Sequence, residues 1–208
     1  MPADVFTHPW LGGLFGDDRI AELLSAEASL ANMLRVEAAF ARAQGTAGAI
    51  DKDLAEAAAS GIAACEITPK ELRTGTARDG VPVPALVQLL KARLPETLHP
   101  AIHAGLTSQD VVDTALVLAL VPALAELQSR LSAMIEALEA LDHQFGARRL
   151  MGRTRMQAAL PIGAAGLSRL LAYGPRRYRR ACRLAVARFG NAGKDRPGYR
   201  LDGPAGDR

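Results

Sequence analysis

The sequence predicts an all-α protein in which an N-terminal helical domain is followed by part of a long-helix bundle. Hydrophobic residues make up 49% of the 208 residues, but aromatic residues make up only 4%. Alanine and leucine dominate the hydrophobic set, and both favour helix interiors over sheets. Apolar residues also recur at spacings of three and four, and one such segment is much longer than an ordinary helix.

The N-terminal part of the chain carries the first helix signals. Residues 18–44 show the apolar spacing of an amphipathic helix, which Gly45 would close. A second, shorter helix is predicted to follow Asp51. These two segments would begin the N-terminal helical domain.

Two more short helices are predicted before residue 100. Thr68, Pro69 and Glu71 combine an N-cap residue, a proline at the first helical position and an acid three residues after the cap. We expect a loop over residues 75–80. Residues 83–94 then place four leucines on one helical face, before prolines end the helix.

The longest predicted helix runs from Ser108 to about Phe145 and contains Pro122. With a rise of about 1.5 Å per residue, it would be about 55 Å long. A helix of this length extends beyond the core of one small domain. We therefore expect it to pack in a bundle with helices of other copies, in a homo-oligomer.

The C-terminal part of the chain is strongly basic. Residues 166–208 hold eleven Lys or Arg against three acids, while the whole chain has a net charge of +3. Such a run is either a nucleic-acid-binding arm or a solvated charged segment. We do not expect nucleic acid as a partner, because few aromatic side chains accompany the arginines for base stacking: Tyr173, Tyr178, Phe189 and Tyr199.

We expect three regions along the chain. Residues 1–107 would form the N-terminal helical domain, and residues 108–167 would start the central bundle. Residues 168–208 would form a basic tail rich in Arg, Gly and Pro, partly disordered, with residues 194–208 disordered.

Other sequence features exclude several classes of protein. No apolar run is long enough for a membrane span, and the N-terminus lacks the pattern of a signal peptide, so we expect a cytoplasmic protein without membrane contact. Cys65 and Cys182 are isolated from each other and from any zinc-binding spacing. Both are expected to be free thiols.

A cluster of polar residues lies where the longest predicted helix begins. It consists of His103, Thr107, Ser108, Gln109 and Asp110. In one interpretation Thr107 and Asp110 simply form a capping box. In the other, the cluster binds an anion such as a carboxylate, because exposed N–H groups and the helix dipole favour negative charge there.

The cluster is also part of a longer motif. Residues 103–114 read His-x-Gly-x-Thr-Ser-Gln-Asp-x-x-Asp-Thr, which resembles the first signature region of the fumarase/aspartase superfamily. The version is that of adenylosuccinate lyases and 3-carboxy-cis,cis-muconate cycloisomerases. Residues 6–17 are similar to the cycloisomerase N-terminus, and residues 151–162 resemble that family's second signature region. The resemblance covers residues 5–165, with the three motifs in order.

The resemblance implies an isomerase of protocatechuate breakdown that forms a lactone from a muconate polycarboxylate. It also implies a homotetramer whose active sites each take residues from three subunits, and no metal or organic cofactor. The substrate is then a small polycarboxylate.

The resemblance also implies roles for particular residues. His103, Thr107, Ser108 and Gln109 would bind the substrate carboxylates, and Asp110 would orient them or cap the helix. From the second region, Arg153, Thr154 and Gln157 are candidates, because Arg offers two parallel donors to a carboxylate. The alternative there is a turn before a helix, with Arg153 solvated.

The sequence departs from the family pattern in two places. Arg155 stands where many lyases of the superfamily have a His, which weakens an adenylosuccinate lyase-like assignment, our second alternative. The superfamily's serine loop, roughly Gly-Ser-Ser-x-Met-Pro-x-Lys-x-Asn-Pro, does not occur in these residues, so the catalytic base is unknown. A further alternative is therefore a truncated, inactive relative that serves as a helical subunit or binding protein.

Overall fold

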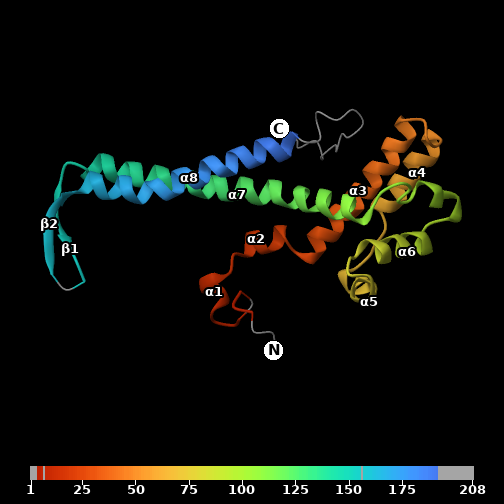
Figure 1. The fold of residues 1–208 in the computed structure, drawn as a ribbon, viewed down its shortest axis with the longest axis horizontal. Coiled ribbons are helices and arrows are strands. Elements are labelled where there is room, and N and C mark those ends of the chain that lie inside the picture. The colour runs from red at the N-terminus through yellow and green to blue at the C-terminus, as the bar shows by residue number, and fades with distance from the viewer. Residues whose placement is uncertain (1–3, 7, 156, 192–208) are drawn as a thin grey trace. The chain divides into compact units, whose positions relative to one another are not determined.

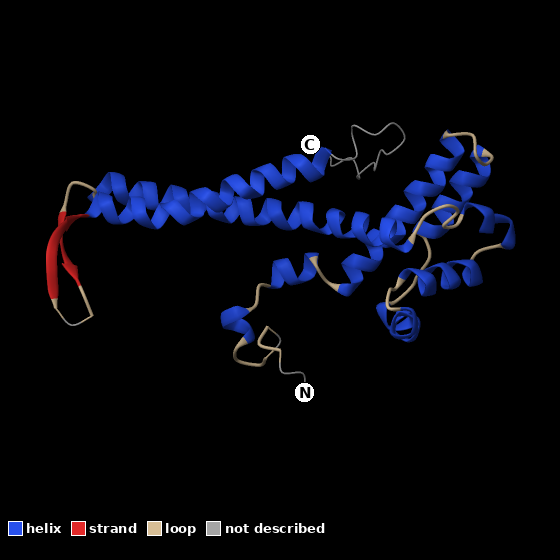
Figure 2. Ribbon diagram, in the orientation of Figure 1, coloured by secondary structure: helices blue, strands red, loops and turns tan. Residues whose placement is uncertain are grey.

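The structure, a computed structural model, describes residues 4–6, 8–155 and 157–191. It is mostly helical, which confirms the predicted fold class. Figure 2 shows the helices together with one two-stranded sheet. The segment over 194–208 that was expected to be disordered lies outside the described residues.

The chain divides into two compact units. Unit 1 comprises the chain up to Pro122 together with the residues from Phe189 onward, and unit 2 comprises residues 123–188. The division falls within the longest helix, whereas the sequence placed the start of the bundle at Ser108. Each unit is described by itself below.

Unit 1 begins with helices α1 (Gly12–Phe15), α2 (Asp18–Leu23) and α3 (Ala26–Thr46) (Figure 1). A single helix was predicted over residues 18–44, but the helix is interrupted at Leu24 and Ser25. The Ser25 hydroxyl accepts a hydrogen bond from the Ala28 amide at 3.0 Å and so caps a new helix. Serine commonly offers the backbone this alternative to a continuous helix.

Three more helices follow: α4 (Lys52–Ala63), α5 (Pro69–Asp79) and α6 (Val83–Arg93). All three were predicted, but the loop expected over residues 75–80 was wrong, since α5 continues to Asp79. Gly75 lies inside α5, and a Cβ atom there would overlap the Ala85 side chain of α6. The glycine permits close helix packing, and Gly80, with φ of 76°, ends the helix.

Gly45 repeats this behaviour in α3. The sequence predicted that it closes the helix, but α3 continues through it to Thr46. Gly45 is buried, and a Cβ atom there would overlap the Ala55 side chain of α4. The tight contact between α3 and α4 therefore accounts for this glycine.

The core of unit 1 joins α3, α4, α6 and the start of α7 (Ser108–Phe145). A 3₁₀-helix, η1 (Glu96–Ala101), packs on α4 and leads the chain back toward α3. Side chains without exposed surface fill this core: Val36, Ala41, Ala58, Ile62, Leu86, Leu90 and Val111. The predicted bounds of the longest helix are confirmed, and Pro122 lies inside it.

Unit 2 contains the rest of α7, a hairpin of β1 (Arg149–Arg153) and β2 (Ala158–Gly163), and the first part of α8 (Ala164–Asn191). The hairpin was not predicted. Gly152 and Pro161 disfavour a helix over these residues. The antiparallel pairing instead lets the chain reverse between α7 and α8.

Helix α8 was also missed, because residues 168–208 were assigned to a basic, partly disordered tail and no helix was predicted there. It runs antiparallel to α7 within unit 2 (Figure 1). The Ser168 hydroxyl donates to Asp142 at 2.7 Å, and Arg176 pairs with Glu139 at 2.8 Å. Part of the basic run is therefore neutralised by acids of α7, which sequence spacing could not show.

The two helices of unit 2 leave many apolar side chains exposed. Ile135, Ala172 and Cys182 are buried. The large exposed ones are Leu127, Met134, Leu141, Leu167, Leu170, Leu171, Tyr173, Tyr178 and Leu184. Cys65 and Cys182 are free thiols, as predicted. Among the described helices, none is both long and apolar enough to span a bilayer.

Candidate functional site

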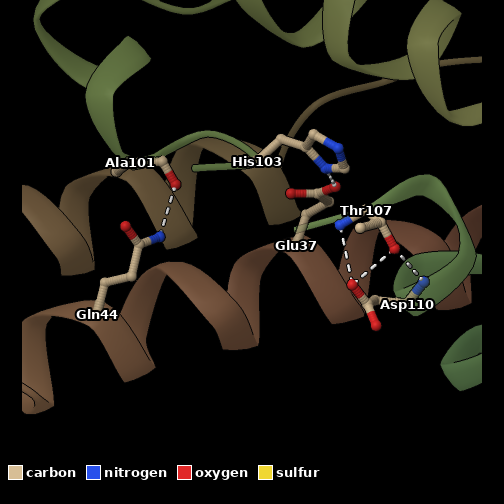
Figure 3. A network of polar contacts seen from close by, with 6 residues as sticks. All are labelled: Glu37, Gln44, Ala101, His103, Thr107 and Asp110. Atoms are coloured by element: carbon tan, nitrogen blue, oxygen red, sulfur yellow. Dashed lines mark hydrogen bonds and ion pairs between the residues drawn. The ribbon is translucent and has the colours of Figure 1, made fainter. Parts of the chain in front are cut away.

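The N-terminus of α7 is closed by a reciprocal cap between Thr107 and Asp110 (Figure 3). The backbone amide and the hydroxyl of Thr107 donate to Asp110 Oδ2 at 2.9 and 2.7 Å. The Asp110 amide donates to the Thr107 hydroxyl oxygen at 3.2 Å. The capping interpretation is thus confirmed for these two residues. The same bonds hold the pKa of the Asp110 carboxyl below its usual range.

We expect Asp110→Ala to destabilise the protein at neutral pH and less so in acid. The folded-state pKa of Asp110 is lowered, so its contribution is present above the unfolded-state pKa and is lost as pH falls through the folded value. Urea unfolding of both proteins from pH 7 down into the acid range checks this. A stability difference that stays constant over that range would contradict it; the exposed Asp53→Ala is the control.

Two other residues of the cluster, Ser108 and Gln109, lie outside the cap. The Gln109 side chain is exposed and donates to Asp113 Oδ1 at 2.5 Å. Ser108, the first residue of α7, is half-buried, and its hydroxyl has no hydrogen-bond partner within the described chain. Because the cap already occupies Thr107 and Asp110, Ser108 is the hydroxyl that remains free for a ligand.

His103 lies beside this helix start and pairs with a residue that the sequence did not single out. Its Nδ1 atom lies 2.7 Å from Glu37 Oε1 of α3 (Figure 3). The Glu37 side chain has no exposed surface, whereas that of His103 is 19% exposed. Burial raises the pKa of Glu37, and the His103 ring opposes that rise.

A sequence signal for Glu37 did exist. It lies four residues from both Met33 and Ala41, on the face of α3 that is buried. A charged residue on an apolar helical face is uncommon unless it is paired. The partner could not be identified, because His103 is 66 residues away along the chain.

The second candidate region forms the tip of the hairpin in unit 2. The Thr154 amide and hydroxyl both donate to the Gln157 carbonyl, at 2.9 and 3.3 Å, and so close the turn. Arg153, Thr154 and Gln157 are all exposed. The structure shows Arg153 exposed to solvent, as the alternative interpretation expected.

The structure thus gathers the candidates in two groups. His103, Thr107, Ser108, Gln109 and Asp110 lie together at the α7 N-terminus in unit 1. The hairpin residues lie together in unit 2. In the described parts of the chain, no three His, Cys, Asp or Glu side chains are grouped so that they could hold a metal ion.

The structure is thus that of a helical protein whose longest helix begins beside hydroxyl, amide and imidazole groups. The chain matches the family model described as "Lyase" over residues 16–194. It belongs to this lyase family, of the fumarase/aspartase superfamily.

Individual relatives are about 30% identical in sequence to this chain. The chain is 31% identical to trans-aconitate decarboxylase 1 of Mycosarcoma maydis, over 73% of this chain and 31% of the relative. It is 31% identical to the 3-carboxy-cis,cis-muconate cycloisomerase of Bradyrhizobium diazoefficiens, over 88% and 43%. The 3-carboxy-cis,cis-muconate lactonizing enzyme of Pseudomonas putida superposes with a TM-score of 0.75 at 28% identity, over 88% and 42%. The chain therefore spans less than half the length of these relatives.

Proposed function

We propose that the chain belongs to an enzyme that acts on an unsaturated polycarboxylate, and that this enzyme is a 3-carboxy-cis,cis-muconate cycloisomerase. Two of the relatives above are named for trans-aconitate and for 3-carboxy-cis,cis-muconate, which each have three carboxylates and at least one carbon–carbon double bond. The observation that carries the proposal is the group of donors at the α7 N-terminus beside the free Ser108 hydroxyl.

The proposed reaction is an intramolecular addition. One substrate carboxylate oxygen bonds to a carbon of the double bond, and the adjacent carbon takes a proton, so that a lactone forms without loss of atoms. Negative charge develops on the carboxylate next to the carbon that receives the proton. Donors fixed in place before the reaction stabilise that charge without reorganising.

In this proposal each region of the chain contributes to binding. The Ser108 hydroxyl, the Gln109 amide and the His103 ring would bind one carboxylate at the helix dipole. Arg153, Thr154 and Gln157 would bind a second carboxylate in a site completed by other copies of the chain. The exposure of the Arg153 and Gln157 side chains leaves their donors accessible for that role.

We expect trans-aconitate, a stable tricarboxylate, to raise the melting temperature of the protein and Ser108→Ala to remove most of this rise. At a ligand concentration of one hundred times Kd, the stabilisation is about 2.7 kcal/mol. Differential scanning fluorimetry measures the shift, with acetate at equal ionic strength as the control. Equal shifts in wild type and Ser108→Ala would place the site elsewhere.

Ser108 is a better test position than His103. Replacing His103 would leave the Glu37 carboxylate buried without its partner. The unliganded protein would then change in stability, and the effect on binding could not be separated from it. Ser108 makes no such contact within the described chain.

We also propose that the chain is a homo-oligomer and expect an oligomeric mass in solution. Unit 2 leaves many large apolar side chains of α7 and α8 exposed, and a second copy of the chain would cover such side chains. Light scattering coupled to size-exclusion chromatography measures the mass. Leu170, which is 72% exposed, is the informative position, and Leu170→Glu should lower the mass. A monodisperse wild-type monomer would contradict the proposal.

A further inference from the structure

Glu37 and His103 form a buried pair that the cap of α7 does not require. Glu37 Oε1 is bonded to the ring, but Glu37 Oε2 is buried without a hydrogen-bond partner among the described residues. A buried carboxylate with an unpaired oxygen is less favourable than an apolar side chain of the same size. The fold therefore keeps an unfavourable group in this place.

The backbone of His103 is unfavourable as well. Its φ is +56°, and it is the one non-glycine residue of the described chain with a positive φ. Left-handed backbone costs free energy for a residue with a side chain and persists where the surroundings enforce it. Such strain is frequent at functional sites. Two unfavourable features therefore meet at one imidazole ring.

The pair controls which ring nitrogen is available and whether it carries a proton. Nδ1 is engaged by Glu37, and Nε2 has no partner among the described residues. Without an added proton, the buried pair would carry a net negative charge, which burial disfavours. With that proton the pair is neutral, and Nε2 carries a hydrogen whether the shared proton lies on Glu37 or on Nδ1.

We propose that Glu37 is a positioning residue that holds His103 with its Nε2–H directed outward as a donor to a substrate carboxylate. This inference rests on the proposed function, and it names a role for a residue on α3, outside both signature regions. Glu37 acts only through His103. Substitution of Glu37 should therefore change the protons on the His103 ring, and the affinity for a carboxylate should change as a consequence.

The test compares wild type, Glu37→Leu, Glu37→Gln and the control Glu27→Gln, an exposed glutamate of the same helix. Nitrogen-15 NMR of the His103 ring is recorded without ligand in mildly alkaline buffer, where an ordinary imidazole is neutral. We expect both ring nitrogens to carry or share a proton in wild type and in Glu27→Gln. In Glu37→Leu, Nδ1 should become a bare acceptor. In Glu37→Gln, the ring should carry a single proton.

The affinity for trans-aconitate is measured by calorimetry on the same proteins. In Glu37→Leu the ring keeps an Nε2–H but loses the buried bond that fixes its orientation, which should weaken binding at least about tenfold. Glu37→Gln should lose less, because its amide still bonds to Nδ1 and holds the ring in place. Glu27→Gln should bind as wild type does. Glu37→Gln also decides the test if Glu37→Leu fails to fold.

Two results would overturn the inference: an Nδ1 signal that is the same in wild type and the Glu37 variants, or a changed signal with unchanged affinity. If wild type itself does not bind trans-aconitate, the proposed carboxylate site fails, and the role of Glu37 at that site fails with it. The ligand-free NMR comparison then still shows whether Glu37 controls the ring. The two failures are therefore distinguishable.

Discussion

A polypeptide of these 208 residues should convert 3-carboxy-cis,cis-muconate at least about a hundredfold more slowly than a full-length cycloisomerase. The resemblance to the superfamily implies a catalytic serine on a loop whose motif does not occur in this sequence. A positioned acid or base typically contributes about a hundredfold to ten-thousandfold to a proton-transfer step. The donors of the two signature regions could still bind the substrate, so affinity should suffer less than turnover.

The measurement is the loss of 3-carboxymuconate absorbance with purified protein. A full-length cycloisomerase assayed under the same conditions is the positive control, and Ser108→Ala is the negative one. A turnover of about one per second or faster, which is an ordinary enzymatic rate, would contradict the prediction. It would show that a residue of this chain takes the role of the missing serine.

Leu86→Ala should destabilise unit 1 by about 2–5 kcal/mol, because it removes the Cγ and both Cδ atoms of a buried side chain and leaves a cavity. Leu86 lies in α6, has no exposed surface and belongs to the core that joins α3, α4 and α6. Urea unfolding followed by circular dichroism measures the loss.

Leu116→Ala is the matched control for this substitution. Leu116 lies in the part of α7 that belongs to unit 1, and it is 51% exposed. Its replacement should change stability by no more than about 0.5 kcal/mol, as for other surface positions. Equal losses in both variants would contradict the prediction.

Local signals predicted several elements of this fold well. The start of α7 at Ser108 and that of α5 at Pro69 follow from capping residues, whose hydrogen bonds reach only three residues along the chain. The length of α7 follows from an unbroken apolar period. Within the candidate site, the contact between Thr107 and Asp110 was predictable for the same reason.

Contacts between distant segments were not predictable. Gly45 and Gly75 were interpreted as helix ends or loop residues, but each lies inside a helix against an alanine of its neighbour. Glycine has the same local signature in both roles. Only the packed helices show which role applies.

The sequence by itself determined the helical class, the capped start of α7 and the cluster of donors beside it, because these depend on residues a few positions apart. The tertiary structure alone decided that α8 is a helix paired with α7, and that His103 is held by Glu37. Both depend on side chains far apart in sequence, 37 residues for Arg176 and Glu139 and 66 for the imidazole pair. Periodicity and motif spacing carry no information about such pairs, since folding brings them together only through the packing of whole helices.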